Sequence, residues 1–203
     1  MCGRYTVFST YAEMQAHFGL ENNINFPASY NAAPSQKLPI IIGNEIRLAS
    51  WGYVPEWARD KDIKPQINAR AETAAEKPYF RSGFQARRCL VPANGFYEWE
   101  KMRGGKQPWY FCHRQGMMAF AGLYSGETFC ILTREACGSV ANIHARMPAI
   151  VPPERYAYWL TADPDGAARL LRKIGGRGVD GYRVSARVNA PANNDATLIE
   201  RSG

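Results

Sequence analysis

The sequence lacks several patterns that would assign a class of function at once. Its longest apolar runs, such as MMAFAGLY at 117–124, are far shorter than the roughly 20 residues that cross a bilayer. The first residues contain no apolar segment of the kind that directs secretion. We therefore expect a cytoplasmic protein, placed at the nucleoid if it binds DNA, that contacts no membrane.

Common nucleotide, metal and hydrolase motifs are also missing. No GxxxxGK[ST], GxGxxG or G-x-S-x-G occurs, so nucleotide folds and the α/β-hydrolase elbow have no support. The five cysteines show no CxxC spacing, and the three histidines show no HExxH. The cysteines are odd in number and scattered, which favours reduced thiols over a disulfide framework. We expect no metal and no cofactor.

Positive charge is what the sequence has in excess. Its 203 residues include 25 Lys and Arg against 18 Asp and Glu, a formal net charge of +7. A basic protein without a membrane segment most often meets a polyanion, and nucleic acid is the commonest one. A soluble basic protein with no such partner is the alternative.

The pattern of apolar residues predicts an α+β fold in one domain over residues 1–203. β-branched and aromatic runs, separated by turn signals, cluster in the middle of the chain, and helical patterns flank them. We therefore expect a mostly antiparallel, strongly twisted sheet or open β-barrel. The expected helices are 10–19, 152–160 and 163–173, and the expected strands are 38–42, 46–51, 88–91, 96–100, 109–112, 117–124, 128–133 and 182–185.

Cys2 directly follows the initiator methionine. Removal of Met1 would leave an α-amine and a thiol on adjacent carbons. A free α-amine has a pKa of about 7.7–8.0, so a useful fraction is neutral and can attack an aldehyde to give a Schiff base. The thiol can then close on the imine carbon to form a thiazolidine ring. The alternative is that Cys2 is a small buried hydrophobic residue.

Three further segments carry polar side chains suited to acid–base or phosphate chemistry. Asn68 and Arg70 share one face of an extended INARAET. Glu98 alternates with aromatics in FYEWE, and such surroundings raise a carboxyl pKa toward that of a general acid. His144 and Arg146, in NIHARMPAI, could move protons and hold phosphate. Each could instead be an ordinary structural or surface residue.

Loop aromatics suggest contacts with unpaired bases. Trp57 lies in a polar segment interrupted by proline, WGYVPEWARD, and Trp51 closes the preceding strand. A tryptophan in such a loop either covers the core or stacks on bases. The loop YNAAPSQ adds Asn31 and Pro34.

These motifs together resemble one family. MCGRY, YNAAP, WGYVPEW, INARAET, RRCLVPANGFYEW and IHARMPAI occur in the order seen in the SOS-response-associated peptidases (SRAP), and VSARVNAPANND resembles the closing segment of that family. The resemblance covers essentially the whole chain. It implies an α+β domain that binds single-stranded DNA and captures abasic sites through a thiazolidine cross-link.

The resemblance also implies roles for individual residues. Cys2 is the nucleophile, Asn68 holds it and the sugar, Glu98 is the general acid/base, and His144 assists proton transfer. The same four would remove Met1 autocatalytically, and a weak lyase activity is possible in principle. In one departure Ala145 stands where the family often has Asp. The implied DNA contacts are Arg4, Asn31, Pro34, Trp57, Arg70, Trp99 and Arg146.

Three hypotheses remain open from the sequence. The protein captures abasic sites through Cys2, or it is a thiol peptidase that uses Cys2 and His144 on other proteins, or it is a non-covalent single-strand binder. Charge and loop tryptophans favour the first and third, and the position of Cys2 favours the first over the third. A monomer is the default expectation.

Overall fold

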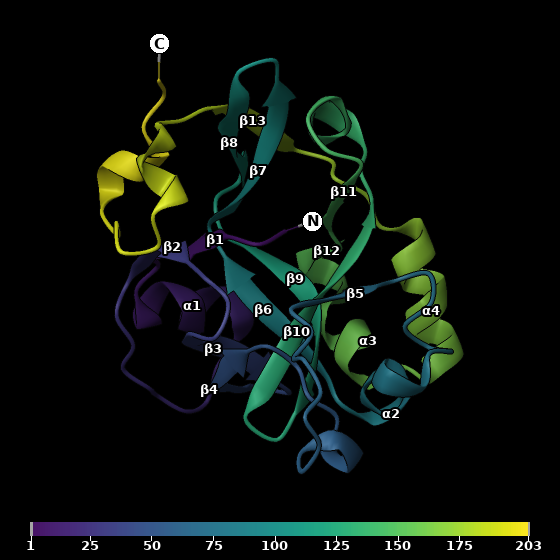
Figure 1. Ribbon diagram of the computed structural model, residues 1–203. Helices are drawn as coiled ribbons and strands as arrows, with labels where there is room; N and C mark the ends of the chain where they lie inside the picture. The colour runs from purple at the N-terminus through teal and green to yellow at the C-terminus, as the bar shows by residue number, and fades with distance from the viewer. Residues whose placement is uncertain (1, 203) are drawn as a thin grey trace.

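The computed structural model describes residues 2–202, which form two β-sheets with helices around them (Figure 1). The first sheet has the strand order β13-β8-β7-β1-β2. Every pairing within it is antiparallel. Its strands are β1 (Tyr5–Val7), β2 (Ser29–Ala32), β7 (Gly95–Met102), β8 (Gly105–His113) and β13 (Val179–Arg183).

The second sheet closes on itself. Its order is β11-β10-β4-β3-β6-β9-β12, and β9 also pairs with β10, so β10, β4, β3, β6 and β9 complete a ring. β5 joins β10 in parallel, and the β4–β10 pair is also parallel. The strands are β3 (Lys37–Ile42), β4 (Glu45–Trp51), β5 (Asn68–Arg70), β6 (Arg88–Ala93), β9 (Met118–Ser125), β10 (Thr128–Glu135), β11 (Arg146–Pro148) and β12 (Ile150–Val151).

Helices cover the sheets at their edges. The α-helices are α1 (Tyr11–Phe18), α2 (Pro78–Ala86), α3 (Tyr156–Thr161) and α4 (Pro164–Lys173). Short 3-10 helices are η1 (Glu56–Ala58), η2 (Gly138–Asn142), η3 (Pro153–Arg155), η4 (Ala186–Asn189) and η5 (Ala196–Ile199). Within the described residues 2–202, no helix is long and apolar enough to cross a membrane. In Figure 1, α1 and α4 lie on opposite sides of the strands, and the yellow carboxyl-terminal segment stands apart beside β2.

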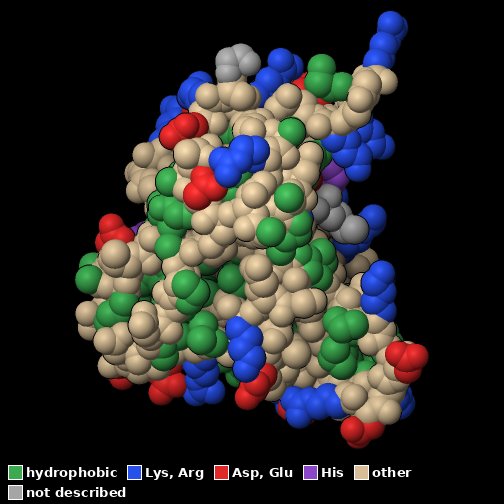
Figure 2. Space-filling model, turned by 60° about the vertical axis from the view of Figure 1, so that its left-hand side comes forward, with side chains coloured by type: hydrophobic (Ala, Val, Ile, Leu, Met, Phe, Trp, Pro, Cys, Tyr) green, Lys and Arg blue, Asp and Glu red, His purple; other side chains and the backbone are tan. Residues whose placement is uncertain are grey.

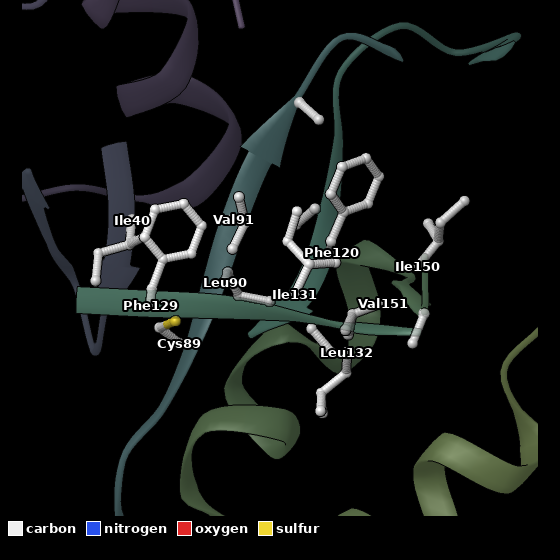
Figure 3. Packing of buried hydrophobic residues seen from close by; sticks show 14 of the residues in the cluster. Ile40, Cys89, Leu90, Val91, Phe120, Phe129, Ile131, Leu132, Ile150 and Val151 are labelled. Carbon is white, nitrogen blue, oxygen red and sulfur yellow. The ribbon is translucent and has the colours of Figure 1, made fainter. Parts of the chain in front are cut away.

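The main core fills the closed ring of strands. Phe120, Phe129 and Ile131 are fully buried there, with side chains of several strands meeting between the ribbons (Figure 3). The ring of Tyr5 packs edge-on against Trp51, with 5.2 Å between ring centroids. Burial of this apolar surface is the main stabilising term, at about 25 cal/mol for each Å² removed from water.

A second, smaller apolar cluster lies under the carboxyl-terminal segment. Tyr97 and Tyr110 pack there with Val188 and Leu198. Phe96, the neighbour of Tyr97 on β7, belongs to the main core instead. The alternation of side chains along β7 therefore places successive residues in two different clusters, as the pattern FYEWE predicts.

The α+β fold class with twisted, mostly antiparallel sheets is confirmed. The capping box of α1 is present, with Thr10 and Glu13 bonding reciprocally and Gly19 in the left-handed conformation. The helix expected over 152–160 is divided into η3 and α3, and the strand expected over 182–185 is β13, which begins and ends earlier. Helix α2 and the short strands β1, β2, β5, β11 and β12 were not predicted.

Candidate functional site

Cys2 lies directly before β1 and is fully buried. Asn68, at the start of β5, donates a hydrogen bond from Nδ2 to the Cys2 carbonyl oxygen at 2.7 Å. The Cys2 thiol in turn points to the Arg4 carbonyl oxygen, 3.8 Å away. The Oδ1 atom of Asn68 is buried and has no hydrogen-bond partner among the described residues. An acceptor is thus held beside Cys2.

Glu98 projects from β7 into the same region and is only 2% exposed. Burial raises the pKa of its carboxyl to about 7, because the charged form loses its hydration. Burial, and then the negative charge of Glu98, raise the pKa of the Cys2 thiol well above its ordinary value. The carboxyl is therefore close enough to the thiol to influence its protonation.

His144 stands between η2 and β11. Its Nδ1 lies 3.9 Å from Oε1 of Glu98. The backbone N–H of Arg146 donates to the same Nδ1 at 2.9 Å. Burial lowers the pKa of His144. The cluster of Cys2, Asn68, Glu98 and His144, here called the Cys2 cluster, therefore joins four separate segments of the chain.

Such a cluster can support nucleophilic attack with proton transfer. A carboxyl with a pKa near neutrality can both give and accept a proton at physiological pH. A histidine with a lowered pKa stays neutral there and can share that role. An amide that fixes the Cys2 backbone orients the attacking group. Within residues 2–202, the structure contains no group of three or more His, Cys, Asp or Glu placed to hold a metal ion.

The Arg146 guanidinium beside this cluster is held by a carboxylate. Its Nη1 and Nη2 donate to the two oxygens of Glu72 at 2.7 and 2.9 Å. Nη2 also donates to the Thr133 carbonyl oxygen at 2.5 Å. Arg70, two residues before Glu72, is exposed at the end of β5. Arg70 can meet a phosphate without rearrangement, whereas Arg146 would share its donors with Glu72.

Arg4 and Asn31 occupy structural positions instead of the exposed ones expected for DNA contacts. Arg4 Nη1 donates to Asn31 Oδ1 at 2.7 Å and to the Val188 carbonyl oxygen at 2.9 Å. Asn31 is 1% exposed, and its Nδ2 faces the carbonyl oxygens of Val188, Ala190 and Asn193. Direct contact between Asn31 and DNA is not supported, because its buried side chain is engaged by Arg4 and by the carbonyls of the carboxyl-terminal segment. The pair instead fastens the carboxyl-terminal segment to β1 and β2.

The three remaining predicted contacts differ in exposure. Trp57, in η1, is 50% exposed, and Lys61 Nζ lies 5.0 Å from the centre of its ring. Trp99 is half-buried, and its Nε1 donates to Asn189 Oδ1 at 2.8 Å. Pro34 is half-buried in the turn after β2. Trp51 is fully buried, so it belongs to the core. Trp57 is thus the tryptophan best placed to stack on a base.

Sequence reasoning missed Glu72 and Thr133 as partners of Arg146. Glu72 lies within INARAET, but 74 positions separate it from Arg146, and no local pattern links them. Lys101 was missed as well, although its positive charge contributes to the lowered pKa of His144 after burial. The one sequence signal for Glu72 is its place in INARAET, the motif that also contains the proposed site residues Asn68 and Arg70.

Fold and site together define an α+β protein with a second-position cysteine beside an amide, a carboxyl and an imidazole. The chain belongs to the SOS response associated peptidase (SRAP) family, whose model matches residues 1–191.

Relatives are similar over nearly their whole length. The abasic site processing protein YoqW of Bacillus subtilis (strain 168) is 37% identical, covering 98% of this chain and 99% of that protein. The abasic site processing protein YedK of Escherichia coli (strain K12) is 30% identical, with coverage of 98% and 99%. A crystal structure of a protein from Bacteroides thetaiotaomicron superimposes with a TM-score of 0.88 at 26% identity, covering 99% of this chain and 100% of that one.

Proposed function

We propose that the protein binds single-stranded DNA and captures abasic sites through a covalent thiazolidine link to Cys2. The observation that carries this proposal is the Cys2 cluster, in which Asn68 Nδ2 lies 2.7 Å from the Cys2 carbonyl oxygen and His144 lies 3.9 Å from Glu98. The relatives named for abasic site processing give it independent support.

The chemistry requires loss of Met1, because an amide nitrogen does not attack an aldehyde. We propose that the Cys2 cluster hydrolyses the Met1–Cys2 bond, or that an aminopeptidase does so. The freed α-amine has a pKa of about 7.7–8.0 and is partly neutral at physiological pH. The resulting terminus carries both nucleophiles of the ring on one residue.

The cross-link forms in balanced steps. The closed ring of an abasic deoxyribose opens to its aldehyde when the anomeric hydroxyl loses a proton, the bond from C1′ to the ring oxygen breaks and the ring oxygen gains a proton. Glu98, with a pKa of about 7, suits the role of moving that proton. The Cys2 amine attacks the aldehyde carbon, a C–N bond forms, and the oxygen leaves as water to give an imine. The Cys2 sulfur then adds to the imine carbon while its proton passes to the nitrogen. The net change is a thiazolidine and one water.

Binding to the strand is attributed to the basic surface. Figure 2 shows Lys and Arg side chains along the top and the right-hand edge of that face, where a histidine is also visible. Neutralised phosphates release counterions, which supplies affinity without sequence preference. An exposed tryptophan such as Trp57 favours single strands, because only unpaired bases offer a free face.

The first measurement is the intact mass of the purified protein, which reports loss of Met1. The protein is then incubated with a single-stranded oligonucleotide that carries one abasic site, and the products are separated on a denaturing gel. We expect a stable shifted band for the wild type and for Cys112→Ala, a half-buried cysteine elsewhere in the fold. Cys2→Ala should give none.

Cys2→Ser separates the amine from the thiol. Once its intact mass shows that Met1 has been lost, this variant has the amine but cannot form a thiazolidine, so its adduct should survive only after reduction with borohydride. Retention of Met1 on all molecules, or no stable wild-type band, contradicts the proposal. A shift on native gels alone would indicate a non-covalent binder, and Cys2-dependent cleavage of labelled casein would indicate a thiol peptidase.

A further inference from the structure

A second site is suggested by a cavity of about 670 Å³ on another part of the molecule. The cavity is bordered by β12, η3, α4 and the first residues of β9 and α3. It continues to the loop before β13. Its lining shares no residue with the Cys2 cluster. The cavity is therefore separate from the site proposed to capture abasic sites.

The floor of the cavity is apolar. Met118, Ile150, Leu170 and Ile174 line it, and each is at most 8% exposed. Methionine and branched aliphatic side chains adapt to other apolar side chains of varied shape. The floor therefore offers a recess for an apolar group that a ligand brings with it.

The lining of the same cavity is strongly basic. Arg155, Arg169, Lys173 and Arg177 all line it and are exposed. None of the four forms an ion pair with another residue in 2–202. Several arginines elsewhere in the fold do form ion pairs with Asp or Glu. Glu154 is the one carboxylate in the lining.

This concentration of charge has a consequence for binding. Arg169 and Lys173 lie four positions apart, so they share one face of α4. Like charges gathered around a concave surface repel one another and focus a positive potential into it. An anionic occupant removes that repulsion.

We propose that this cavity docks an acidic segment of a partner protein, anchored by an apolar side chain in the recess. Arginine forks pair with carboxylates through two parallel hydrogen bonds, which suits aspartate and glutamate side chains. A peptide of carboxylates alone would leave the apolar floor exposed to water, whereas an apolar side chain in the recess removes that surface from water. The combination of basic lining and apolar floor therefore fits a peptide that is acidic along most of its length and apolar at one end.

A single strand of nucleic acid fits these features less well. Binding of successive bases relies on flat aromatic platforms along a basic track. Tyr158 is the one exposed large hydrophobic residue in the lining, and the other tyrosine there, Tyr156, is only 9% exposed, so the lining offers no row of open aromatic faces. The cavity and the Cys2 cluster share no residue, so a segment bound in the cavity does not occupy the Cys2 cluster. The docking proposal does not depend on the function proposed for Cys2.

The test uses the full chain and a fluorescein-labelled peptide of ten residues, with six aspartates followed by alanine, proline, leucine and phenylalanine. Fluorescence anisotropy at low salt should show saturable binding. The double variant Arg169→Glu/Lys173→Glu reverses two exposed charges and should weaken binding at least about tenfold. Arg172→Glu is the matched control, because Arg172 is exposed on α4 outside this cavity. It should bind like the wild type.

Two further peptides test the two parts of the proposal. Replacing the aspartates by asparagines, or the leucine and phenylalanine by serines, should each abolish saturable binding. Failure of the acidic peptide to bind, or equal binding by the double variant, overturns the proposal. So does displacement of the peptide by oligothymidine with the same dependence on Arg169 and Lys173, which would assign the cavity to nucleic acid. The double variant should still cross-link abasic DNA, so the two proposals succeed or fail separately.

Discussion

The backbone N–H of Arg146 donates a hydrogen bond to Nδ1 of His144 across 2.9 Å. The same nitrogen lies 3.1 Å from the Arg146 carbonyl oxygen, which would require a proton on Nδ1. The shorter N–H contact favours the neutral tautomer that holds its proton on Nε2. The residue that follows His144 in this chain is Ala145, whose side chain carries no group that could bond to the imidazole. The backbone of Arg146, two residues further on, therefore orients the imidazole, and the Glu98 carboxylate lies 3.9 Å from the same nitrogen.

We predict that His144 titrates below the ordinary histidine pKa of about 6.5 and is neutral at pH 7. Burial lowers its pKa because the imidazolium loses hydration. Long-range ¹H–¹⁵N NMR on labelled protein, across pH 4–8, should show Nε2 protonated and Nδ1 bare at neutral pH. A midpoint above that ordinary value, or a neutral proton on Nδ1, would contradict this prediction. Ala145→Asp is the informative comparison and should raise the midpoint by placing a negative charge beside the ring.

Glu72→Gln should release Arg146 for phosphate binding. The Glu72 carboxylate is half exposed, and exposed ion pairs contribute only about 0–1 kcal/mol, so the fold should survive. With one more unpaired cation, the plot of log affinity for oligothymidine against log salt should steepen by about 0.7. Arg146→Ala should not steepen the slope of that plot, either alone or combined with Glu72→Gln. An unchanged slope in Glu72→Gln would show that Arg146 makes no additional phosphate contact.

Asn31→Ala should destabilise the protein by about 1–3 kcal/mol, because Arg4 and three backbone carbonyls lose a buried partner. We expect the effect to be local at first, with faster amide hydrogen exchange over 185–199. Thermal unfolding and exchange mass spectrometry measure both. Asn193→Ala, whose side chain makes an exposed contact, should cost less. Equal stability of Asn31→Ala and the wild type would remove the fastening role.

Local sequence patterns predicted most of the fold. The capping residues of α1, the Gly43-Asn44 turn between β3 and β4, and the alternation along β7 are all short-range signals, and each is present in the structure. Helix α2 was missed although Phe80 and Phe84 lie four apart after a proline, because polar residues and a glycine surround them. The short strands were missed since only pairing with distant partners makes them strands.

The site was less accessible to local reasoning. Cys2 and Asn68 lie 66 positions apart and meet only because β5, which pairs in parallel with β10, brings Asn68 to the segment that precedes β1. Their joint role came from family resemblance, while each alone could be an ordinary structural residue. The same resemblance suggested Arg4 and Asn31 as DNA contacts, and only the structure reveals their bonds to residues 188–193. A sequence motif does not reveal how exposed a side chain is, or which distant residues it forms hydrogen bonds with.

Trp57→Ala should weaken binding of oligothymidine by about 1–3 kcal/mol, because an exposed aromatic ring offers a stacking surface for a base. Loss of fold is not expected, since half of this side chain is exposed. Tyr158→Ala is the matched control, as an exposed aromatic that lies in the other cavity, and it should leave DNA affinity unchanged. Equal affinities for Trp57→Ala and the wild type would remove the stacking role.

The rate of cross-linking should fall as the pH rises through about 7 if Glu98 acts as the general acid, because its carboxyl then loses the proton it must donate. Glu98→Gln keeps the shape of the side chain without a proton to transfer. Its rate should be lower by about 10²–10⁴-fold and should lack that limb of the profile. Single-turnover gel assays between pH 5.5 and 8.5 give both curves. A Glu98→Gln profile with the wild-type shape would assign the limb to another group, the Cys2 amine first.

Burial of the Glu98 carboxyl should also lower the free energy of unfolding at alkaline pH, where the carboxyl is charged. Its pKa is about 7 in the fold and about 4.3 in an open chain, so the folded protein holds the proton more tightly. The stabilisation from that proton is complete below about pH 4 and is lost as the pH rises through about 7. Glu98→Gln buries no charge, so it should be more stable than the wild type at pH 8, by about 1–3 kcal/mol, and nearly equal to it at pH 4. Urea unfolding at the two pH values measures this difference, with Glu76→Gln as an exposed control. A Glu98→Gln variant that is less stable than the wild type at pH 8 would mean that favourable contacts of the carboxylate outweigh its burial.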